Sequence, residues 1–184
     1  QLVKRVADIV ASIILIILLS PLLILISIII TFSTGQGFIY KQNRYGINGS
    51  PFKIYKFKTM NVADTGNEAF LKQALKNDSR VTKFGLILRS LSLDELPQIF
   101  NVLIGNMSIV GPRPHAISHN EYYRTKINAY MQRHSLKPGI TGLAQVSGLR
   151  GETKTIEEMN KRIEADLKYI NNFSLLLDLK ILIK

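Results

Sequence analysis

The 184-residue chain contains no cysteine. Disulfide bonds are therefore excluded, together with thiolate metal sites and cysteine nucleophiles. Negative charge is scarce as well: 24 lysines and arginines stand against 13 aspartates and glutamates, which gives a formal net charge of +11. This excess favours an anionic partner, which can be a nucleic acid, an anionic lipid or a phosphorylated substrate. The length suits one domain with a core of its own.

Several well-known catalytic motifs are also missing. The sequence has no GxGxxG fingerprint, no P-loop, and no Ser-His-Asp set with a nucleophile elbow. His115 and His119 are spaced i, i+4, but no third ligand or HExxH pattern accompanies them. We therefore expect no metal site at this pair, and we expect the isolated His134 to be structural.

The two ends of the chain suggest that it is a fragment. It begins at Gln1 rather than at methionine, and it stops at Lys184 inside an apolar pattern. We therefore expect the natural protein to extend beyond one or both ends.

A long apolar segment dominates the N-terminal part. Residues 9–32 contain no charged side chain, and the run is longer than the roughly 20 residues a helix needs to cross a bilayer. A signal peptide is disfavoured because the run is too long and no small-residue cleavage site follows it. A buried core helix is disfavoured because every face of the segment is apolar. The segment therefore indicates a membrane helix.

Ser20 and Pro21 lie at the midpoint of this segment. Proline lacks an N–H and clashes with the preceding turn, which predicts a kink or a break. The carbonyl groups freed there need another donor, and the Ser20 hydroxyl can supply one.

Basic residues flank the segment on both sides. Lys4 and Arg5 precede it, and Lys41 and Arg44 follow it. Because positive flanks mark the cytoplasmic side, both ends can lie there, as in a helix-break-helix that enters the inner leaflet and returns. The alternative is one kinked helix that spans the membrane.

Shorter patterns occupy the rest of the chain. Two β-like runs at 38–40 and 52–57 are joined by turn residues and predict a β-hairpin. We predict helices over residues 68–76, 84–91, 93–104, 118–134 and 155–170, and loops over 61–66 and 138–151. The apolar run 175–183 is too short to span and is expected to lie on the membrane or against the domain. The predicted fold class is α+β and mostly helical. It comprises a re-entrant membrane hairpin at 1–36, a small β-hairpin, and amphipathic interfacial helices within a domain at 37–184.

Two adjacent carboxylates are the leading candidates for chemistry. Asp94 and Glu95 point about 100° apart on a helix, which suits a division of roles. One can attack as a nucleophile while the other binds a divalent metal, and oxygen ligands of this kind suit Mg²⁺. The same residues also fit a capping box with Ser92 as N-cap and Glu95 three residues later. Spacing alone leaves that structural alternative open.

Three basic residues are candidates for phosphate binding. Arg113 stands between two prolines, and a rigidly held arginine suits bidentate phosphate recognition. Lys58 and Arg89 are further candidates. The alternative for each is an ordinary solvated surface residue.

Several linked blocks resemble a known family. They are SLDELPQ at 92–98, NVL at 101–103, MSIVGPRP at 107–114, KPGITGLAQV at 137–146, FKTM at 57–60, and the basic pair and Ser-Pro of the apolar segment. In this order they resemble the bacterial sugar transferases, the monotopic polyprenyl-phosphate phosphoglycosyl transferases. The resemblance covers essentially the whole chain.

The resemblance implies a mechanism and a set of site residues. Asp94 is expected to attack the β-phosphate of a UDP-sugar and release UMP, and undecaprenyl phosphate then attacks the resulting phosphosugar-aspartyl intermediate. Glu95 is expected to bind Mg²⁺. Further residues are expected to bind the nucleotide or the substrate phosphates, namely Lys58, Arg89, Arg113, Gln145 and Asp166. Ser20 and Pro21 are expected to make the hairpin re-entrant.

The resemblance also implies a location and partners. We expect a bacterial inner-membrane enzyme whose catalytic domain faces the cytoplasm. It is expected to transfer hexose-1-phosphate at the first membrane step of exopolysaccharide, capsule or O-antigen synthesis. Membrane lipid is an expected partner and a homo-oligomer is left open. Nucleic acid is not expected, because no recognition-helix motif or interleaved aromatic-basic run is present.

Two other functions stay open on the sequence. One is a membrane-anchored basic module that binds an anionic partner without catalysis. The other is a transferase in which Asp94 acts as a base and no covalent intermediate forms.

Overall fold

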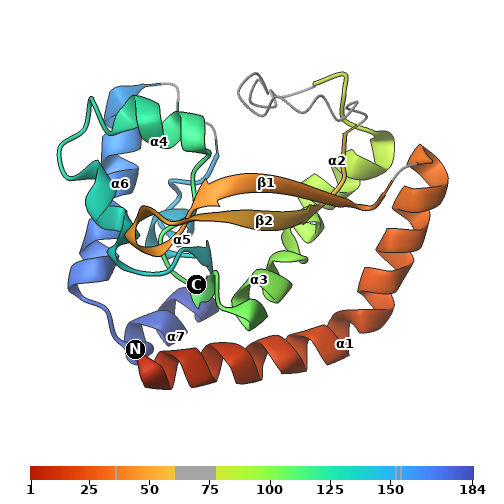
Figure 1. Ribbon diagram of the computed structural model, residues 1–184, viewed down its shortest axis with the longest axis horizontal. Helices are drawn as coiled ribbons and strands as arrows, with labels where there is room; N and C mark the ends of the chain where they lie inside the picture. The colour runs from red at the N-terminus through yellow and green to blue at the C-terminus, as the bar shows by residue number, and fades with distance from the viewer. Residues whose placement is uncertain (36, 61–77, 152, 154) are drawn as a thin grey trace.

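The computed structural model describes residues 1–35, 37–60, 78–151, 153 and 155–184. A long helix, α1, runs along one side of the molecule, and the remaining elements form the body that it borders (Figure 1). The elements are α1 (Leu2–Thr34), β1 (Ile39–Tyr45), η1 (Ile47–Gly49), β2 (Pro51–Phe57), α2 (Lys83–Ser90), η3 (Leu93–Glu95), α3 (Gln98–Ile104), β3 (Ser108–Val110), α4 (Ile117–Tyr123), η4 (Tyr130–Ser135), β4 (Gly139–Thr141), α5 (Leu143–Val146), α6 (Ile156–Asn171) and α7 (Leu175–Ile183). This mostly helical fold with small β elements confirms the predicted class. The loop predicted at 61–66 and the helix predicted at 68–76 lie outside the described residues.

The helix α1 bends without being interrupted. It is one helix of 33 residues with Pro21 inside it, and it turns about halfway along its length (Figure 1). The prediction of two helices separated by a break is therefore wrong, and a kink replaces it. The Ser20 hydroxyl donates to the Ile17 carbonyl at 2.8 Å, which is the acceptor that Pro21 cannot reach. This bond confirms the proposed role of Ser20 and shows how the helix continues past the proline.

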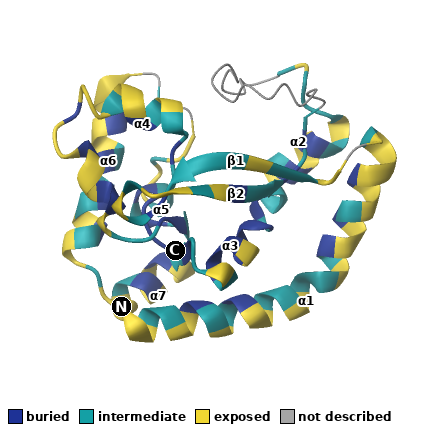
Figure 2. Ribbon diagram, viewed as in Figure 1, coloured by how far each residue is buried: buried dark blue, intermediate teal, exposed yellow. Residues whose placement is uncertain are grey.

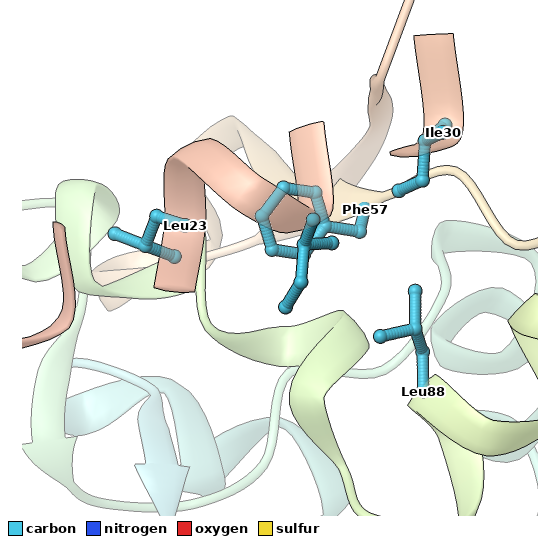
Figure 3. Close-up of a cluster of buried hydrophobic side chains, with 5 residues drawn as sticks. Leu23, Ile30, Phe57 and Leu88 are labelled. Carbon is cyan, nitrogen blue, oxygen red and sulfur yellow. The ribbon is translucent and has the colours of Figure 1, made fainter. Parts of the chain in front are cut away.

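The second half of α1 packs on the body of the molecule through apolar side chains. Leu23, Ile26 and Ile30 pack with Phe57 and Leu88 in one buried cluster. Figure 3 shows this cluster between α1 and the elements that carry Phe57 and Leu88. Elsewhere α1 exposes many large aliphatic residues, as the exposed positions along its outer side show (Figure 2). It is the one helix in the described ranges whose length and composition would allow it to cross a membrane.

The first turns of α1 are attached to the same body by polar contacts. Lys4 pairs with Asp178 of α7 at 2.5 Å. Arg5 donates to the carbonyls of Val102 and Leu103 at 2.6 and 2.7 Å, and so satisfies the C-terminal end of α3. Both halves of α1 are thus held by the part of the chain that follows it.

The predicted β-hairpin is confirmed. β1 and β2 pair antiparallel from Ile39 opposite Phe57 to Tyr45 opposite Pro51. The turn η1 between them contains Asn48 and Gly49 at positive φ, which suits the predicted turn residues. The sheet positions the side chains of β2 toward α3 and η3.

The region predicted as a loop at 138–151 contains regular structure, so that prediction is wrong in part. β4 pairs in parallel with β3, and α5 follows it. A Cβ on Gly139 would lie 2.1 Å from the Gly111 nitrogen, so the two segments approach at a distance that only glycine allows. This pairing joins residues far apart in the sequence, which a local pattern does not reveal.

The single helix predicted over residues 118–134 is also wrong. α4 ends at Tyr123, and the chain turns through Ala129 at φ 60° before η4 begins. The turn places Ile127 and Tyr130 in a buried cluster with residues of α6. Burial of these side chains therefore outweighs the helical preference of the segment.

The C-terminal helices follow the sequence patterns closely. α6 is capped by Thr155, which forms the reciprocal capping box with Glu158, and this confirms the helix predicted over 155–170. Its buried positions are Met159, Ile163, Asp166 and Tyr169. α7 packs through Ile181 and exposes several leucines, so it lies against the domain as expected.

Candidate active site

The Asp94-Glu95 pair lies on a short turn rather than on the helix predicted over 93–104. η3 contains both carboxylates, and α3 begins only after Pro97. Pro97 has no N–H to donate to the preceding turn, so it disfavours a continuous α-helix across this position, and here α3 starts only after it. The predicted single helix is therefore wrong, and the dyad lies on an isolated 3₁₀ turn between α2 and α3.

The structure also excludes the capping box. Ser92 has the left-handed conformation, with φ 59°, and its side chain makes no capping hydrogen bond. Its hydroxyl accepts instead from Arg150 at 2.7 Å. The carboxylate of Glu95 is engaged elsewhere, so these residues are not explained by helix capping.

Glu95 is a buried carboxylate held by two cations. Lys56 of β2 donates to its Oε1 at 2.8 Å, and Arg113 binds both of its oxygens, at 3.0 Å for the Nη1–Oε2 bond. Burial by itself raises the pKa of the Glu95 carboxyl, but Lys56 and Arg113 outweigh it and hold that pKa well below its ordinary value. Glu95 is therefore ionised at neutral pH and fixed in a bidentate clamp.

Asp94 differs from its neighbour because its carboxylate is left without such partners. No hydrogen bond or ion pair to it is formed by the described residues. Burial raises the pKa of Asp94 above its ordinary value, Lys56 lowers it, and Glu95 raises it again. A partly desolvated carboxylate without a hydrogen-bond or ion-pair partner is suited to act as a nucleophile or a base.

Arg89 brings a third positive charge near Asp94. Its Nε donates to the Thr59 hydroxyl at 2.9 Å, and its charge lowers the pKa of Asp94. Thr59 lies very close to α2: a Cβ on Gly85 would come within 2.2 Å of the Thr59 carbonyl oxygen, so only glycine fits there. The structure therefore places Arg89, a predicted phosphate-binding residue, close to Asp94.

Lys56 is the site residue that the sequence analysis missed. Lys58, a predicted binding residue, follows the end of β2 and is half-buried, and Lys56, two residues earlier, contacts Glu95. The binding role expected for Lys58 stays a prediction, and the structure adds Lys56 to the candidates. Burial lowers the pKa of Lys56, and Glu95 opposes that effect.

Asn101 fixes β2 relative to the dyad. Its amide accepts from the Tyr55 N–H at 2.9 Å and donates to the Lys53 carbonyl at 2.8 Å. The side chain is fully buried, so these two bonds satisfy groups that water does not reach. Lys56 thereby reaches Glu95 from a strand that is tied to α3.

Two predicted binding residues lie further from the dyad. Asp166 is 1% exposed and pairs with Arg133 at 2.7 Å. The Gln145 amide donates to the Ile140 carbonyl of β4 at 2.8 Å. The described contacts therefore bring Glu95, Arg113 and Arg89 together with Asp94, and place Asp166 and Gln145 outside this group.

The histidines behave as structural residues. His115 is buried, its Nδ1 lies 2.7 Å from the Tyr130 hydroxyl, and burial holds its pKa well below the ordinary value. His134 is buried too, and its ring packs edge-on against Tyr45 at 6.1 Å between centroids. The described residues include no group of three or more histidine, cysteine, aspartate or glutamate side chains that could hold a metal ion.

The arrangement as a whole is suited to phosphate groups. Lys56, Arg89 and Arg113 bring three positive charges close to the two carboxylates of Asp94 and Glu95, so these five groups carry an excess of one positive charge when all are ionised. Phosphoryl transfer depends chiefly on positioning and on such charge neutralisation. The geometry therefore defines the class of site as one that transfers or binds phosphorylated substrates.

Comparison with known proteins agrees with this class. The family model described as "Bacterial sugar transferase" matches residues 1–184, and the chain therefore belongs to the bacterial sugar transferase family. It is 55% identical over 97% of its length to the UDP-glucose:undecaprenyl-phosphate glucose-1-phosphate transferase of Klebsiella pneumoniae. It is 52% and 48% identical, over 98% of its length, to the proteins with the same name from Escherichia coli K12 and Caulobacter vibrioides. The matches cover 38%, 39% and 67% of these three relatives, so the chain spans about two fifths of the first two.

Proposed function

We propose that this protein transfers a hexose-1-phosphate from a UDP-sugar to undecaprenyl phosphate, with Asp94 as the nucleophile. The observation that carries the proposal is the contrast within the dyad: Glu95 is fixed by Lys56 and Arg113, whereas the Asp94 carboxylate is free of such partners in the described structure. The relatives named above act on UDP-glucose, which favours glucose as the sugar.

The reaction balances as two displacements at the same phosphorus. An Asp94 oxygen attacks the β-phosphorus of the UDP-sugar, the bond to the bridging oxygen breaks, and UMP leaves with that oxygen. A phosphate oxygen of undecaprenyl phosphate then attacks the phosphosugar-aspartyl group, the bond to Asp94 breaks, and a lipid-linked diphosphosugar is released. Lys56, Arg89 and Arg113 stabilise the charge on the phosphate oxygens in both steps.

We propose Mg²⁺ as the metal, with Glu95 as its protein ligand. Mg²⁺ commonly uses only one or two protein carboxylates beside substrate phosphates, so the two carboxylates of the dyad fit its chemistry. Oε1 of Glu95 accepts from both Lys56 and Arg113, whereas Oε2 accepts only from Arg113 and keeps a second lone pair for the ion. The ion supplies neutralisation of the diphosphate charge.

The body of the molecule supports a re-entrant α1 at the inner bacterial membrane. Arg5 is bound to α3 near one end of α1, and Leu23 and Ile30 pack on Phe57 and Leu88 near the other. A helix that crossed the bilayer would need parts of this polar body on both sides. We therefore propose that α1 enters and leaves on the cytoplasmic side, with its exposed aliphatic residues in lipid.

The absence of cysteine makes the topology directly testable. Gln1 and Gly37 are exposed, and a Cβ on Gly37 meets no atom within 4 Å, so single cysteines can be placed at either end. Both Gln1→Cys and Gly37→Cys should react with a membrane-impermeant maleimide only in inverted vesicles. Labelling of the two variants from opposite sides would contradict the re-entrant topology.

The reaction is tested by UMP release from a panel of UDP-sugars, with Mg²⁺ and undecaprenyl phosphate present. We expect release from a UDP-hexose by the wild type, and none by Asp94→Asn or after EDTA treatment. Without the acceptor, labelled UMP should exchange into the UDP-sugar, because the covalent intermediate forms first. Turnover without this exchange would indicate a single displacement with Asp94 as base. A folded wild type in lipid with no release from any sugar would favour a non-catalytic anion-binding module.

A further inference from the structure

We propose that the buried Arg133–Asp166 pair is a positioning device that holds the backbone of Arg113, so that the Arg113 guanidinium meets Glu95 and the substrate phosphates. The inference rests on the proposed function, because it assumes that Arg113 acts on those phosphates. It gives Asp166 a role through Arg133 and Arg113 instead of direct contact with the nucleotide.

The pair is joined to the site by a short chain of hydrogen bonds. Arg133 donates from Nε and Nη2 to the same oxygen of Asp166, at 3.1 and 2.7 Å. The same Nη2 also donates to the Arg113 carbonyl at 2.5 Å. Arg113 in turn binds both oxygens of Glu95. Asp166 on α6 is thereby connected through two arginines to the turn that carries the dyad.

Both side chains of this pair are shielded from water, so neither forms a surface contact with a soluble partner. Arg133 and Asp166 have side-chain exposures of only 1% and 2%. A buried ion pair is a weak source of stability compared with apolar packing, and one reason to keep it is that it specifies one local geometry. Here it presents a charged donor to a main-chain carbonyl.

The backbone around Arg113 is restrained on both sides of that carbonyl. On one side, Gly111 donates to the Thr141 carbonyl at 2.9 Å, and Pro112 accepts from Gly139 at 2.9 Å. On the other side, His115 is held through its ring by Tyr130. Pro112 and Pro114 also limit the dihedral angles next to Arg113.

Because the neighbouring backbone is restrained, a shift of the Arg113 carbonyl is expected to move the Arg113 side chain as well. The Arg133 bond is made at Arg113 itself, between the two sets of anchors. A lysine at position 133 could still pair with Asp166, but its single ammonium lacks the planar fork that serves the carboxylate and the carbonyl together. Arg133→Lys therefore tests the geometry while keeping the charge.

The experiment is a double-mutant cycle on kcat/KM for UMP release, using the full chain in lipid. We expect Arg133→Lys to lower kcat/KM roughly 10- to 100-fold, the range for losing one hydrogen bond to a charged group. In an Arg113→Lys background, the same change should have less than about a threefold effect, because residues that act through one another are not additive. Asp166→Asn should behave like Arg133→Lys in both backgrounds.

A matched control separates positioning from general stability. Asp178→Asn breaks another largely buried ion pair, with Lys4, in a different part of the fold. It should lower Tm as much as Arg133→Lys does, yet leave kcat/KM within about twofold of the wild type.

Three results would overturn the inference. One is a folded Arg133→Lys protein with unchanged kcat/KM, and another is a loss that persists in full in the Arg113→Lys background. The third is failure of both Arg133→Lys and Asp166→Asn to fold while Asp178→Asn folds, which would assign the pair to folding. An inactive wild type would contradict the proposed function itself, which is distinguishable from an active wild type with unaffected variants.

Discussion

Replacing Glu95 with glutamine should destabilise the protein in a pH-dependent way. The substitution removes the charge that Lys56 and Arg113 share and leaves two cations without a carboxylate. Removing one partner of a buried pair costs about 3–5 kcal/mol. Lys56 and Arg113 keep 22% and 26% of their side chains exposed, so water can solvate them in part. We therefore expect a loss of about 2–3 kcal/mol.

The corresponding change in Tm is large enough to measure. For a chain of this size, 1 kcal/mol shifts Tm by roughly 2–4 °C, so the variant should melt roughly 5–10 °C lower at pH 7. Because the chain has no tryptophan, far-UV circular dichroism in detergent is the suitable assay. The control is Glu121→Gln, which changes an exposed pair with Arg124 and should move Tm by no more than about 2 °C.

The pH dependence has a definite sign. The folded pKa of Glu95 lies below its unfolded value of about 4.3, so ionised Glu95 contributes stability above that pH and loses it as pH falls toward the folded pKa. The difference between the wild type and Glu95→Gln should be constant from about pH 6 to 8 and shrink below about pH 4. An unchanged Tm at pH 7, or a difference that does not shrink in acid, would refute the ion-pair reasoning.

The remaining predictions concern Asp94, the other carboxylate of the dyad, and two residues that hold neighbouring elements in place, Asn101 and Gly85. Asp94→Asn should abolish UMP release. It should also leave Tm unchanged or higher, because burial raises the pKa of Asp94 and disfavours its ionised form. A lower Tm would contradict this. For the same reason, the acid limb of the wild-type kcat/KM profile should lie above about pH 3.9, the ordinary pKa of an aspartate. Asn101→Ala should cost about 2–3 kcal/mol in thermal unfolding, because two buried hydrogen bonds to β2 are lost, and a cost near zero would show that β2 is held otherwise. Gly85→Ala should lower both Tm and activity, since its Cβ would collide with the Thr59 carbonyl, whereas Gly37→Ala, with open space around it, should change neither.

If Asp94→Asn raises Tm and Glu95→Gln lowers it, the two carboxylates have different roles in the site. Burial raises the pKa of Asp94 and so disfavours its ionised form, whereas Lys56 and Arg113 stabilise the ionised form of Glu95. Active sites commonly carry such a locally destabilised group because its reactivity depends on being unpaired. The two variants measured side by side would thus test the division of roles within the dyad.

Features that depend on neighbouring residues were predictable from the sequence. The long apolar helix α1, the turn residues of the β-hairpin and the amphipathic helix predicted over 155–170 all depend on patterns that act over a few positions, and each was confirmed. Pro21 signalled a distortion for the same local reason, although the Ser20 hydroxyl made it a bend rather than a break. Arg89 and Arg113 were candidates from the residues themselves, and both lie near the dyad, while their role in phosphate binding stays a prediction.

What only the tertiary structure decided involves residues distant in the chain. Lys56 reaches Glu95 across 39 positions because Asn101 ties β2 to α3, and no local pattern distinguishes this lysine from Lys58. The end of α4 and the burial of Arg133 depend likewise on packing against α6. The sequence by itself determined which groups are available and which segments are helical or extended. Their pairing was decided by folding, because a buried charge is stable only where the folded chain brings it a partner.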